Sequence, residues 1–206
     1  LVGSEMCIRD RIDRGERPVD ILEYVMDKPN ITVLLGNHEV MARDFLRRLT
    51  AEITDGNTAS FDNDFMVELA IYKHYGGIPT INRLLALPPD KQQRVLDFID
   101  SLYAYEAIDI GDSTFVLVHA GLGNFRKDKK ISEYALYELL ELRPDYERQY
   151  FDDDSIYIVS GHTPTKLISG KWEIYHSHNN IVIDCGAAFG GRLACLRLED
   201  MAEFYV

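Results

Sequence analysis

The chain has 206 residues, of which 46% are hydrophobic and 27% charged, and its formal net charge is −12. This size and composition fit one globular domain with a core of its own. The negative charge argues against sequence-independent binding to nucleic acid and against docking on anionic membranes, since both need clustered Lys and Arg. No apolar run has the length of a membrane span. The three cysteines show no metal-type spacing and form no even disulfide set, which favours a reducing, cytoplasmic setting.

In the first half of the chain, apolar residues recur three and four positions apart and predict helices over 17–28, 40–49, 64–77 and 88–103. Between the first two, the run "ITVLL" (31–35) predicts a strand buried on both faces. Residues 51–63 are polar and turn-rich, which indicates a loop or an insertion.

In the second half, residues 106–122 predict two strands joined by a Gly-Asp turn, and residues 132–142 predict a helix. The tail is rich in strands, which we expect over 156–163, 180–186, 192–200 and 202–206. No repeat or linker divides the chain, so we expect residues 1–206 to form a single domain. Helices early and strands late predict an α/β fold of sheets enclosed by helices.

Three apolar strands end in the same way. Asn37 follows "TVLLG", His119 follows "TFVLV", and His162 follows "IYIVSG". The carboxyl ends of strands in open α/β sheets form the crevice where ligands bind, and small neighbouring residues allow close approach. A single histidine at a strand end is more often a core residue satisfied by hydrogen bonds, but three repetitions favour a metal site. Imidazole and amide ligands joined by a carboxylate suit Mn, Fe or Zn.

Upstream, the segment "DRIDRGERP" (10–18) contains Asp10, Asp13 and Arg14. Taken alone, this segment fits a solvated entrance to a helix, with Asp13 as the cap. The series "DRIDRG", "GNHE", "VHAGL" and "GHTP" nevertheless resembles the motifs of the calcineurin-like metallophosphoesterases, in the same order. Within that family it is most similar to the branch of the serine/threonine phosphoprotein phosphatases and the symmetrical diadenosine-tetraphosphatases. The resemblance covers residues 10–198 and implies a layered β-sandwich flanked by helices.

The resemblance also implies roles for individual residues. Asn37, His119 and His162 would ligate one of two divalent metal ions, for which manganese is favoured over iron or zinc, and Asp10 would be the carboxylate shared by both. His38 would protonate the leaving oxygen, and Asp13 would orient this imidazole and favour its charged form. Arg14 would bind the substrate phosphate through its planar guanidinium. Two such cations lower the pKa of a water molecule and stabilise both the attacking and the leaving oxygens.

The chain departs from the family pattern at its start. The Gly-Asp-x-His-Gly motif that holds the first metal is missing, and "LVGSEMCIR" is not the apolar strand expected before Asp10. We interpret residues 1–11 as non-native sequence joined to a fragment, so that the fold lacks its first strand. On this interpretation the chain is impaired and holds one metal ion in place of two.

The sequence therefore predicts a metal-dependent phosphoester or phosphoanhydride hydrolase. Its substrate would be a phosphorylated protein or a dinucleoside polyphosphate, and nuclease activity is disfavoured by the acidic charge. The alternative is an inactive phosphate- or metal-binding module of the same fold. No second phosphate-binding arginine can be chosen among Arg126, Arg143 and Arg192. Other polar residues take structural interpretations: Glu39 buttresses its loop, Asp184 caps a turn or supports a ligand, Cys185 is a buried thiol, and His176 and His178 lie on the surface.

Overall fold

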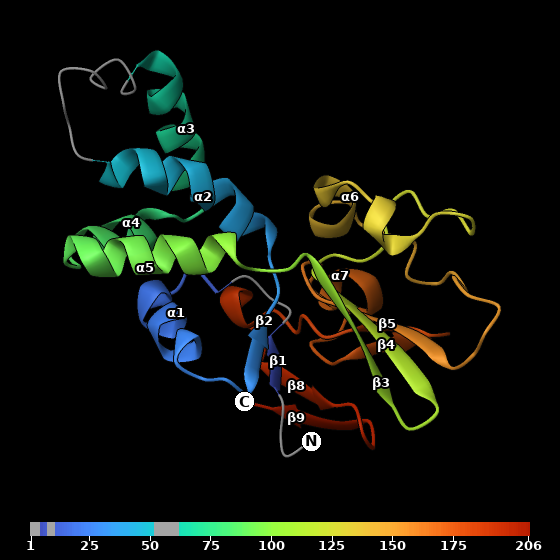
Figure 1. Cartoon of the computed structure of the whole chain (residues 1–206). Helices are drawn as coiled ribbons and strands as arrows, with labels where there is room; N and C mark the ends of the chain where they lie inside the picture. Colours follow the sequence, from blue (N-terminus) through green and yellow to red (C-terminus); the bar gives the residue numbers. More distant parts are fainter. Residues whose placement is uncertain (1–4, 8–10, 52–61) are drawn as a thin grey trace. The chain divides into compact units, whose positions relative to one another are not determined.

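The computed structural model describes residues 5–7, 11–51 and 62–206, and separates them into two compact units (Figure 1). The helical unit comprises the described residues of 11–33 and 37–102 together with residues 5 and 6. The sheet unit comprises residues 34–36 and 103–206 together with Cys7. Each unit is described by itself below, and the predicted single domain over residues 1–206 stays a prediction.

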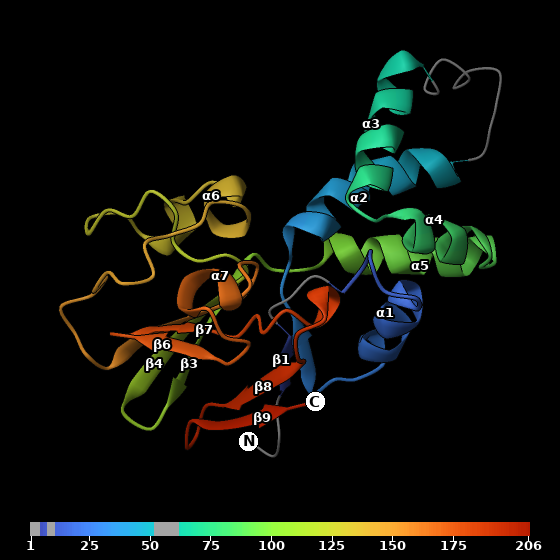
Figure 2. The ribbon, with the colours of Figure 1, turned by 180° about the vertical axis from the view of Figure 1, so that it is seen from behind.

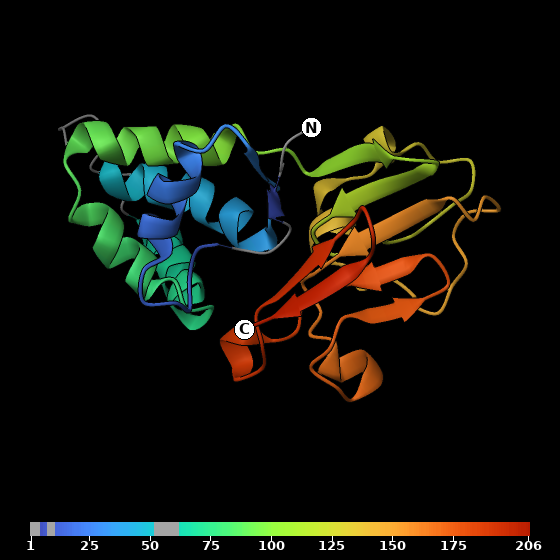
Figure 3. The same ribbon diagram turned by 90° about the horizontal axis from the view of Figure 1, so that it is seen from below.

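The helical unit contains a core of apolar side chains from several helices. Its helices are α1 (Pro18–Met26), α2 (Asn37–Thr50), α3 (Asn63–His74), α4 (Ile78–Leu85) and α5 (Pro89–Asp100). Leu22, Leu46, Leu84, Leu96 and Ile99 are at most 2% exposed and belong to the same apolar cluster. Figure 3 shows α1, α2, α4 and α5 lying together in one group. The periodic apolar spacing that predicts the helices therefore also supplies this core.

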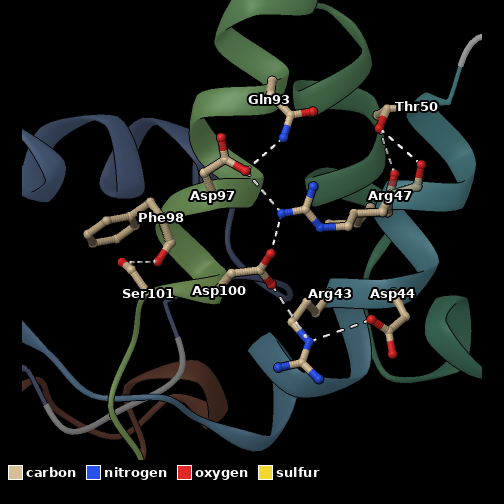
Figure 4. A network of polar contacts seen from close by, with 10 residues as sticks. Arg43, Asp44, Arg47, Thr50, Gln93, Asp97, Phe98, Asp100 and Ser101 are labelled. Atoms are coloured by element: carbon tan, nitrogen blue, oxygen red, sulfur yellow. Dashed lines mark hydrogen bonds and ion pairs between the residues drawn. The ribbon is translucent and has the colours of Figure 1, made fainter.

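Helices α2 and α5 are further joined by charged side chains at the surface. Arg47 of α2 donates to Asp97 at 3.1 Å and to Asp100, both on α5, as Figure 4 shows. The side chains of Arg47, Asp97 and Asp100 are 32%, 61% and 38% exposed, so solvent screens their attraction.

The two strands of a small sheet lie on either side of α1 in the sequence. Strand β2 (Ile31–Val33) forms where the sequence predicts one, and it pairs with β1 (Glu5–Cys7). Residues 5–7 thus supply a short partner for β2, and the prediction that the fold lacks the family's first strand and its metal motif stays a prediction. Asp10, the predicted shared metal ligand, lies outside the described residues.

The sheet unit is organised around one mixed five-stranded sheet, in the order β3-β4-β5-β7-β6. Its strands are β3 (Tyr105–Ile110), β4 (Ser113–Val118), β5 (Ile156–Ser160), β6 (Tyr175–Ser177) and β7 (Asn180–Val182). Strands β4, β5 and β7 run parallel, and the outer strands β3 and β6 are antiparallel to their neighbours. Figure 2 shows β6 and β7 side by side at one edge. Parallel strands place their carboxyl ends at one edge of the sheet.

Shorter elements complete the sheet unit. They are a 3-10 helix (Ile131–Glu133), α6 (Leu136–Leu140), α7 (Lys166–Ser169), a second 3-10 helix (Ala187–Phe189), and the antiparallel pair β8 (Ala194–Arg197) and β9 (Ala202–Tyr205). Among the described helices, none is long and apolar enough to cross a bilayer.

The α/β class is confirmed, and most predicted elements form, with three kinds of difference. Helix α2 begins at Asn37 and not at residue 40, so the "NHE" side chains belong to its first turn. Helices α4 and α7 and strand β6 were not predicted, since each is short. The helix predicted over 132–142 is reduced to Leu136–Leu140 after a 3-10 turn. Most of the predicted loop over 51–63 lies outside the described residues.

Candidate active site

In the helical unit, Asp13 and His38 form a buried pair. His38 lies in the first turn of α2, and its Nδ1 is 2.6 Å from Oδ2 of Asp13. The two residues are 2% and 5% exposed. Asp13 has a φ of 68°, a left-handed conformation that non-glycine residues rarely adopt and that concentrates at functional sites. The structure thus brings together two residues that the sequence assigns to one role.

Two hydroxyl groups hold the other oxygen of Asp13. Tyr72 of α3 donates to Oδ1 at 2.6 Å, and Thr80 of α4 donates to the same atom at 2.7 Å. The backbone N–H of Asp13 donates to the Thr80 hydroxyl at 3.0 Å, so these two residues are joined in both directions. Tyr72 is fully buried and Thr80 is 1% exposed. We refer to Asp13, His38, Tyr72 and Thr80 as the Asp13 network.

The Asp13 network fixes which nitrogen of His38 carries a proton towards Asp13. Burial first, and then the charge of Asp13, raises the pKa of Tyr72 far above its ordinary value, so its hydroxyl stays a donor. With two hydroxyl donors on Oδ1, the Asp13 carboxylate accepts at Oδ2 as well, and His38 donates through Nδ1. The Nε2 atom is therefore the ring nitrogen that does not bind Asp13.

Arg14 follows Asp13 and is also left-handed, with a φ of 56°. Its backbone N–H donates to the carbonyl of Gly76 at 3.0 Å. Gly76 has a φ of 95°, and a Cβ at that position would lie 2.9 Å from Cγ of Arg14, so the close approach requires glycine. Arg14 itself is exposed, and its predicted contact with a phosphate stays a prediction.

Asn37 and Glu39 occupy the same first turn of α2 as His38. Glu39 is fully buried, and its Oε1 accepts a hydrogen bond from the backbone N–H of Arg11 at 2.8 Å. This contact supports the structural interpretation of Glu39, because it ties the segment before Asp13 to α2. Asn37 is half-buried, and its predicted role as a metal ligand stays a prediction.

In the sheet unit, His119 and His162 lie side by side. His119 follows β4 and His162 follows the neighbouring parallel strand β5, with Leu117 opposite Val159 in the register. The Nε2 atom of His119 is 3.2 Å from Nδ1 of His162, and His119 is fully buried. Gly161 donates to the carbonyl of His119 at 2.8 Å, and His162 has a left-handed φ of 62°. The sequence predicts that Asn37, His119 and His162 meet at one cation; the structure brings the two histidines together, and the three-residue site stays a prediction.

The geometry of this pair fits the ligation of one cation. Two nitrogens that each bind a metal ion at about 2.0–2.1 Å lie roughly 3.0–3.4 Å apart when they are neighbouring ligands, and the observed separation is 3.2 Å. Among the described residues, no third His, Cys, Asp or Glu side chain joins them in a metal-binding group. The remaining predicted ligands are Asn37, in the helical unit, and Asp10, outside the described residues, so the complete ligand set stays a prediction.

The third parallel strand, β7, is followed by Asp184 and Cys185. Asp184 is 3% exposed, and its Oδ1 accepts a hydrogen bond from the backbone of Gly186 at 2.9 Å, so it caps the following turn. Cys185 is fully buried, and burial raises the pKa of its thiol, which keeps it protonated and unreactive. His176 and His178 are exposed, as predicted.

Tyr72 and Thr80 are the site residues that the sequence did not reveal. Tyr72 precedes the segment "YGGIPT" (75–80) and Thr80 ends it, and the predicted helix over 64–77 stops at its two glycines. The signal that could have identified them is the pair of glycines, because glycine also permits the close approach that Gly77 makes to the ring of Tyr72.

Comparison with known proteins shows the family to which this chain is similar. The family model for the calcineurin-like phosphoesterases matches residues 10–195. A bis(5'-nucleosyl)-tetraphosphatase PrpE (asymmetrical) from Bacillus cereus (strain AH820) is 27% identical over an alignment of 210 positions, which covers 94% of this chain and 75% of the relative. The protein of the same name from Bacillus cereus strain Q1 is 30% identical, and its alignment also covers 94% of this chain and 75% of the relative. A crystal structure of a candidate diadenosine tetraphosphatase superposes with a TM-score of 0.62 at 13% identity, over 98% of this chain and 78% of the other.

The chain therefore belongs to the calcineurin-like phosphoesterase family, whose members are hydrolases that use divalent metal ions. The crystal structure shares the fold, and its low identity carries no conclusion about substrate. Both PrpE relatives are named for the asymmetrical reaction, whereas the motifs resemble a branch that includes the symmetrical enzymes.

Proposed function

We propose that this chain hydrolyses a phosphoanhydride bond of a dinucleoside polyphosphate with the help of divalent cations. The observation that carries the proposal is the Asp13 network, in which a buried carboxylate orients an imidazole at 2.6 Å. Three buried side chains, His38, Tyr72 and Thr80, donate to this one carboxylate, and stability alone does not explain such an arrangement. The names of the PrpE relatives favour a dinucleoside polyphosphate over a phosphorylated protein.

The residues of this chain divide the reaction between them. We assign the cation ligands to His119 and His162, with Asn37 and Asp10 completing the set by resemblance to the family. When bound, the cations supply charge stabilisation and lower the pKa of the attacking water. Arg14 binds the phosphate that is transferred. His38, held by Asp13, donates a proton from Nε2 to the oxygen of the leaving nucleotide, which carries negative charge as the bond breaks.

The Asp13 network makes His38 suited to this role. The carboxylate holds the ring in one orientation and stabilises its charged form, while Tyr72 and Thr80 keep the carboxylate from rotating towards another donor. Hydrolysis of a phosphoanhydride suits this role, because its leaving oxygen belongs to a phosphate that gains negative charge. Protonation or a bound cation neutralises that charge and makes the phosphate a better leaving group.

The experiment is an assay of diadenosine tetraphosphate hydrolysis with added Mn²⁺, with the products separated by ion exchange. We expect turnover to depend on Mn²⁺, and the relatives' names lead us to expect cleavage away from the centre of the tetraphosphate. His119→Ala should remove turnover, and His176→Ala, an exposed histidine of the same unit, should not. A background that is unaffected by Mn²⁺ and by both variants would favour the inactive binding module.

A further inference from the structure

A hollow of about 320 Å³ lies in the sheet unit, between the segment that follows β4 and the segment that precedes β5. Its volume is at the lower end of the range of small-molecule sites, about 300–1,000 Å³. Leu122, Pro144 and Tyr150 give it an apolar wall, and Arg143 and Arg148 line it as well. In a chain with a formal charge of −12, a hollow with two arginines and one aspartate is locally cationic.

Stacked side chains form one side of this hollow. The guanidinium of Arg148 lies over the ring of Phe125, 5.0 Å from its centroid, and 5.7 Å from the centroid of Tyr150. Phe125 meets Tyr150 edge to face at 4.8 Å, and the Tyr150 hydroxyl donates to the carbonyl of Asp145 at 3.0 Å. Tyr150 is 4% exposed, so its position is fixed, while Arg148 is exposed. A guanidinium backed by an aromatic ring is a surface on which a flat base stacks.

Two polar side chains stand beside this stacking surface. Asp145 lines the hollow, and one of its carboxylate oxygens accepts from the backbone N–H of Glu147 at 3.1 Å. Asn124 also lines it, and its amide nitrogen donates to Glu138 at 3.2 Å, which orients its amide oxygen as an acceptor. A carboxylate and an amide oxygen accept hydrogen bonds from an amino group and disfavour a phosphate directly against them. The hollow therefore has the chemistry of a site for a base with an exocyclic amino group.

The hollow is close along the chain to the imidazole pair. Leu122 is three residues beyond His119, a separation that the backbone spans in at most about 11 Å. Gly121, with a φ of 125°, packs so closely on Pro144 that a Cβ would lie 2.6 Å from Cγ of that proline. This contact joins the turn after His119 to the segment that carries Asp145 and Arg148.

We propose that this hollow binds an amino-bearing nucleobase of the substrate, with Arg148 and Phe125 as its stacking surface and Asp145 and Asn124 as acceptors for its amino group. The inference rests on the proposed function, because it assigns the nucleoside end of a dinucleoside polyphosphate. It goes further by naming the part of the chain that distinguishes such a substrate from a simple phosphoester.

The test is a calorimetric titration of the full chain with adenosine 5'-monophosphate and, separately, with inorganic phosphate. We expect the monophosphate to bind about tenfold more tightly than phosphate, since stacking of one base contributes on that order. Arg148→Gln should lower the ratio of the two affinities about tenfold. Arg126→Gln is the matched control, because Arg126 is an exposed arginine nearby in sequence that does not line the hollow. Phe125→Leu, which keeps an apolar side chain, should lower the ratio in the same direction.

Equal affinities for the monophosphate and phosphate in the wild-type chain, or equal effects of Arg148→Gln and Arg126→Gln, would overturn the inference. Measurements of hydrolysis distinguish failure of the base-site inference from failure of the proposed function. If the wild-type chain hydrolyses p-nitrophenyl phosphate and diadenosine tetraphosphate, and Arg148→Gln leaves the ratio of their kcat/KM values unchanged, the base site is wrong and the proposed function stands. If neither substrate is hydrolysed, the proposed function fails, and the monophosphate titration still decides whether the hollow binds a base.

Discussion

In the helical unit, Asp13 is surrounded by donors from three helices, whereas in the sheet unit two imidazole nitrogens of His119 and His162 face one another at 3.2 Å. The first arrangement is complete within the protein, since both oxygens of the carboxylate accept from protein donors. The second joins two groups that can each act as donor or acceptor, and its spacing suits a shared cation. The difference teaches that the Asp13 carboxylate is held by hydrogen bonds within its own unit, whereas strand register brings the two imidazoles of the sheet unit to a spacing that suits ligands of one cation.

The largest effect should come from removing the acid that the Asp13 network holds. His38→Ala should lower kcat for diadenosine tetraphosphate by about 10²–10⁴-fold, the usual contribution of a general acid. The loss should be smaller for p-nitrophenyl phosphate, because p-nitrophenol is a better leaving group and needs less protonation. The measurement is the ratio of wild-type to variant kcat for both substrates. Equal losses for the two would contradict the role of His38 as an acid.

A smaller effect should follow from removing a donor to Asp13. Tyr72→Phe leaves a buried carboxylate with one donor fewer, which should lower the free energy of unfolding by about 1–3 kcal/mol. Urea denaturation measures this, with Tyr24→Phe, at a residue that is 61% exposed, as the control.

Thr80→Val should lower kcat, and Thr80→Ser should restore it because it returns the hydroxyl. A purely structural role would change stability and leave the leaving-group dependence of kcat unaltered.

A buried carboxylate of the sheet unit, Glu138, has the ammonium of Lys129 as its main donor. The Lys129 ammonium, at 2.6 Å, together with the backbone N–H of Ala135, lowers the pKa of Glu138 below its ordinary value of 4.5. A lowered pKa in the folded state means stability that is present above pH 4.5 and is lost as the pH falls through the folded pKa. Urea midpoints of the wild-type chain and Glu138→Gln should differ at neutral pH and converge on acidification. A difference that grows towards low pH would refute this sign.

The smallest effect should come from the exposed network of Figure 4. Arg47→Ala removes contacts to Asp97 and Asp100, yet these side chains are partly in solvent, so the free energy of unfolding should fall by less than about 1 kcal/mol. Activity should not change. If Arg47→Ala lowers the free energy of unfolding as much as Tyr72→Phe does, burial is not the cause of the different stabilities that the two networks contribute.

The sequence predicted the parts of the fold that rest on long periodic patterns. Helices α1, α2, α3 and α5 and the β3–β4 hairpin lie close to their predicted positions, because apolar spacing also fills their cores. The short elements α4 and β6 were missed, since eight or fewer residues carry too little periodicity and their formation depends on tertiary packing.

The candidate site was predicted where strand ends carried the signal. His119 and His162 follow parallel neighbouring strands, so their proximity follows from β-sheet geometry. Tyr72 and Thr80 could not be predicted in the same way, because their contact with Asp13 crosses 59 and 67 positions of sequence and depends on how α3 and α4 pack. Motifs therefore pointed to the candidate groups, while the hydroxyl groups that contact Asp13 required the structure.

The most direct test of the account is a titration of the chain with Mn²⁺, followed by electron paramagnetic resonance. We predict that His119→Ala and His162→Ala each raise the dissociation constant at least about tenfold, since even residues that only support a ligand change metal affinity 10–100-fold. His38→Ala and His176→Ala should leave it close to the wild-type value. Unchanged Mn²⁺ binding in the His119 and His162 variants would contradict the assignment of this pair to a cation.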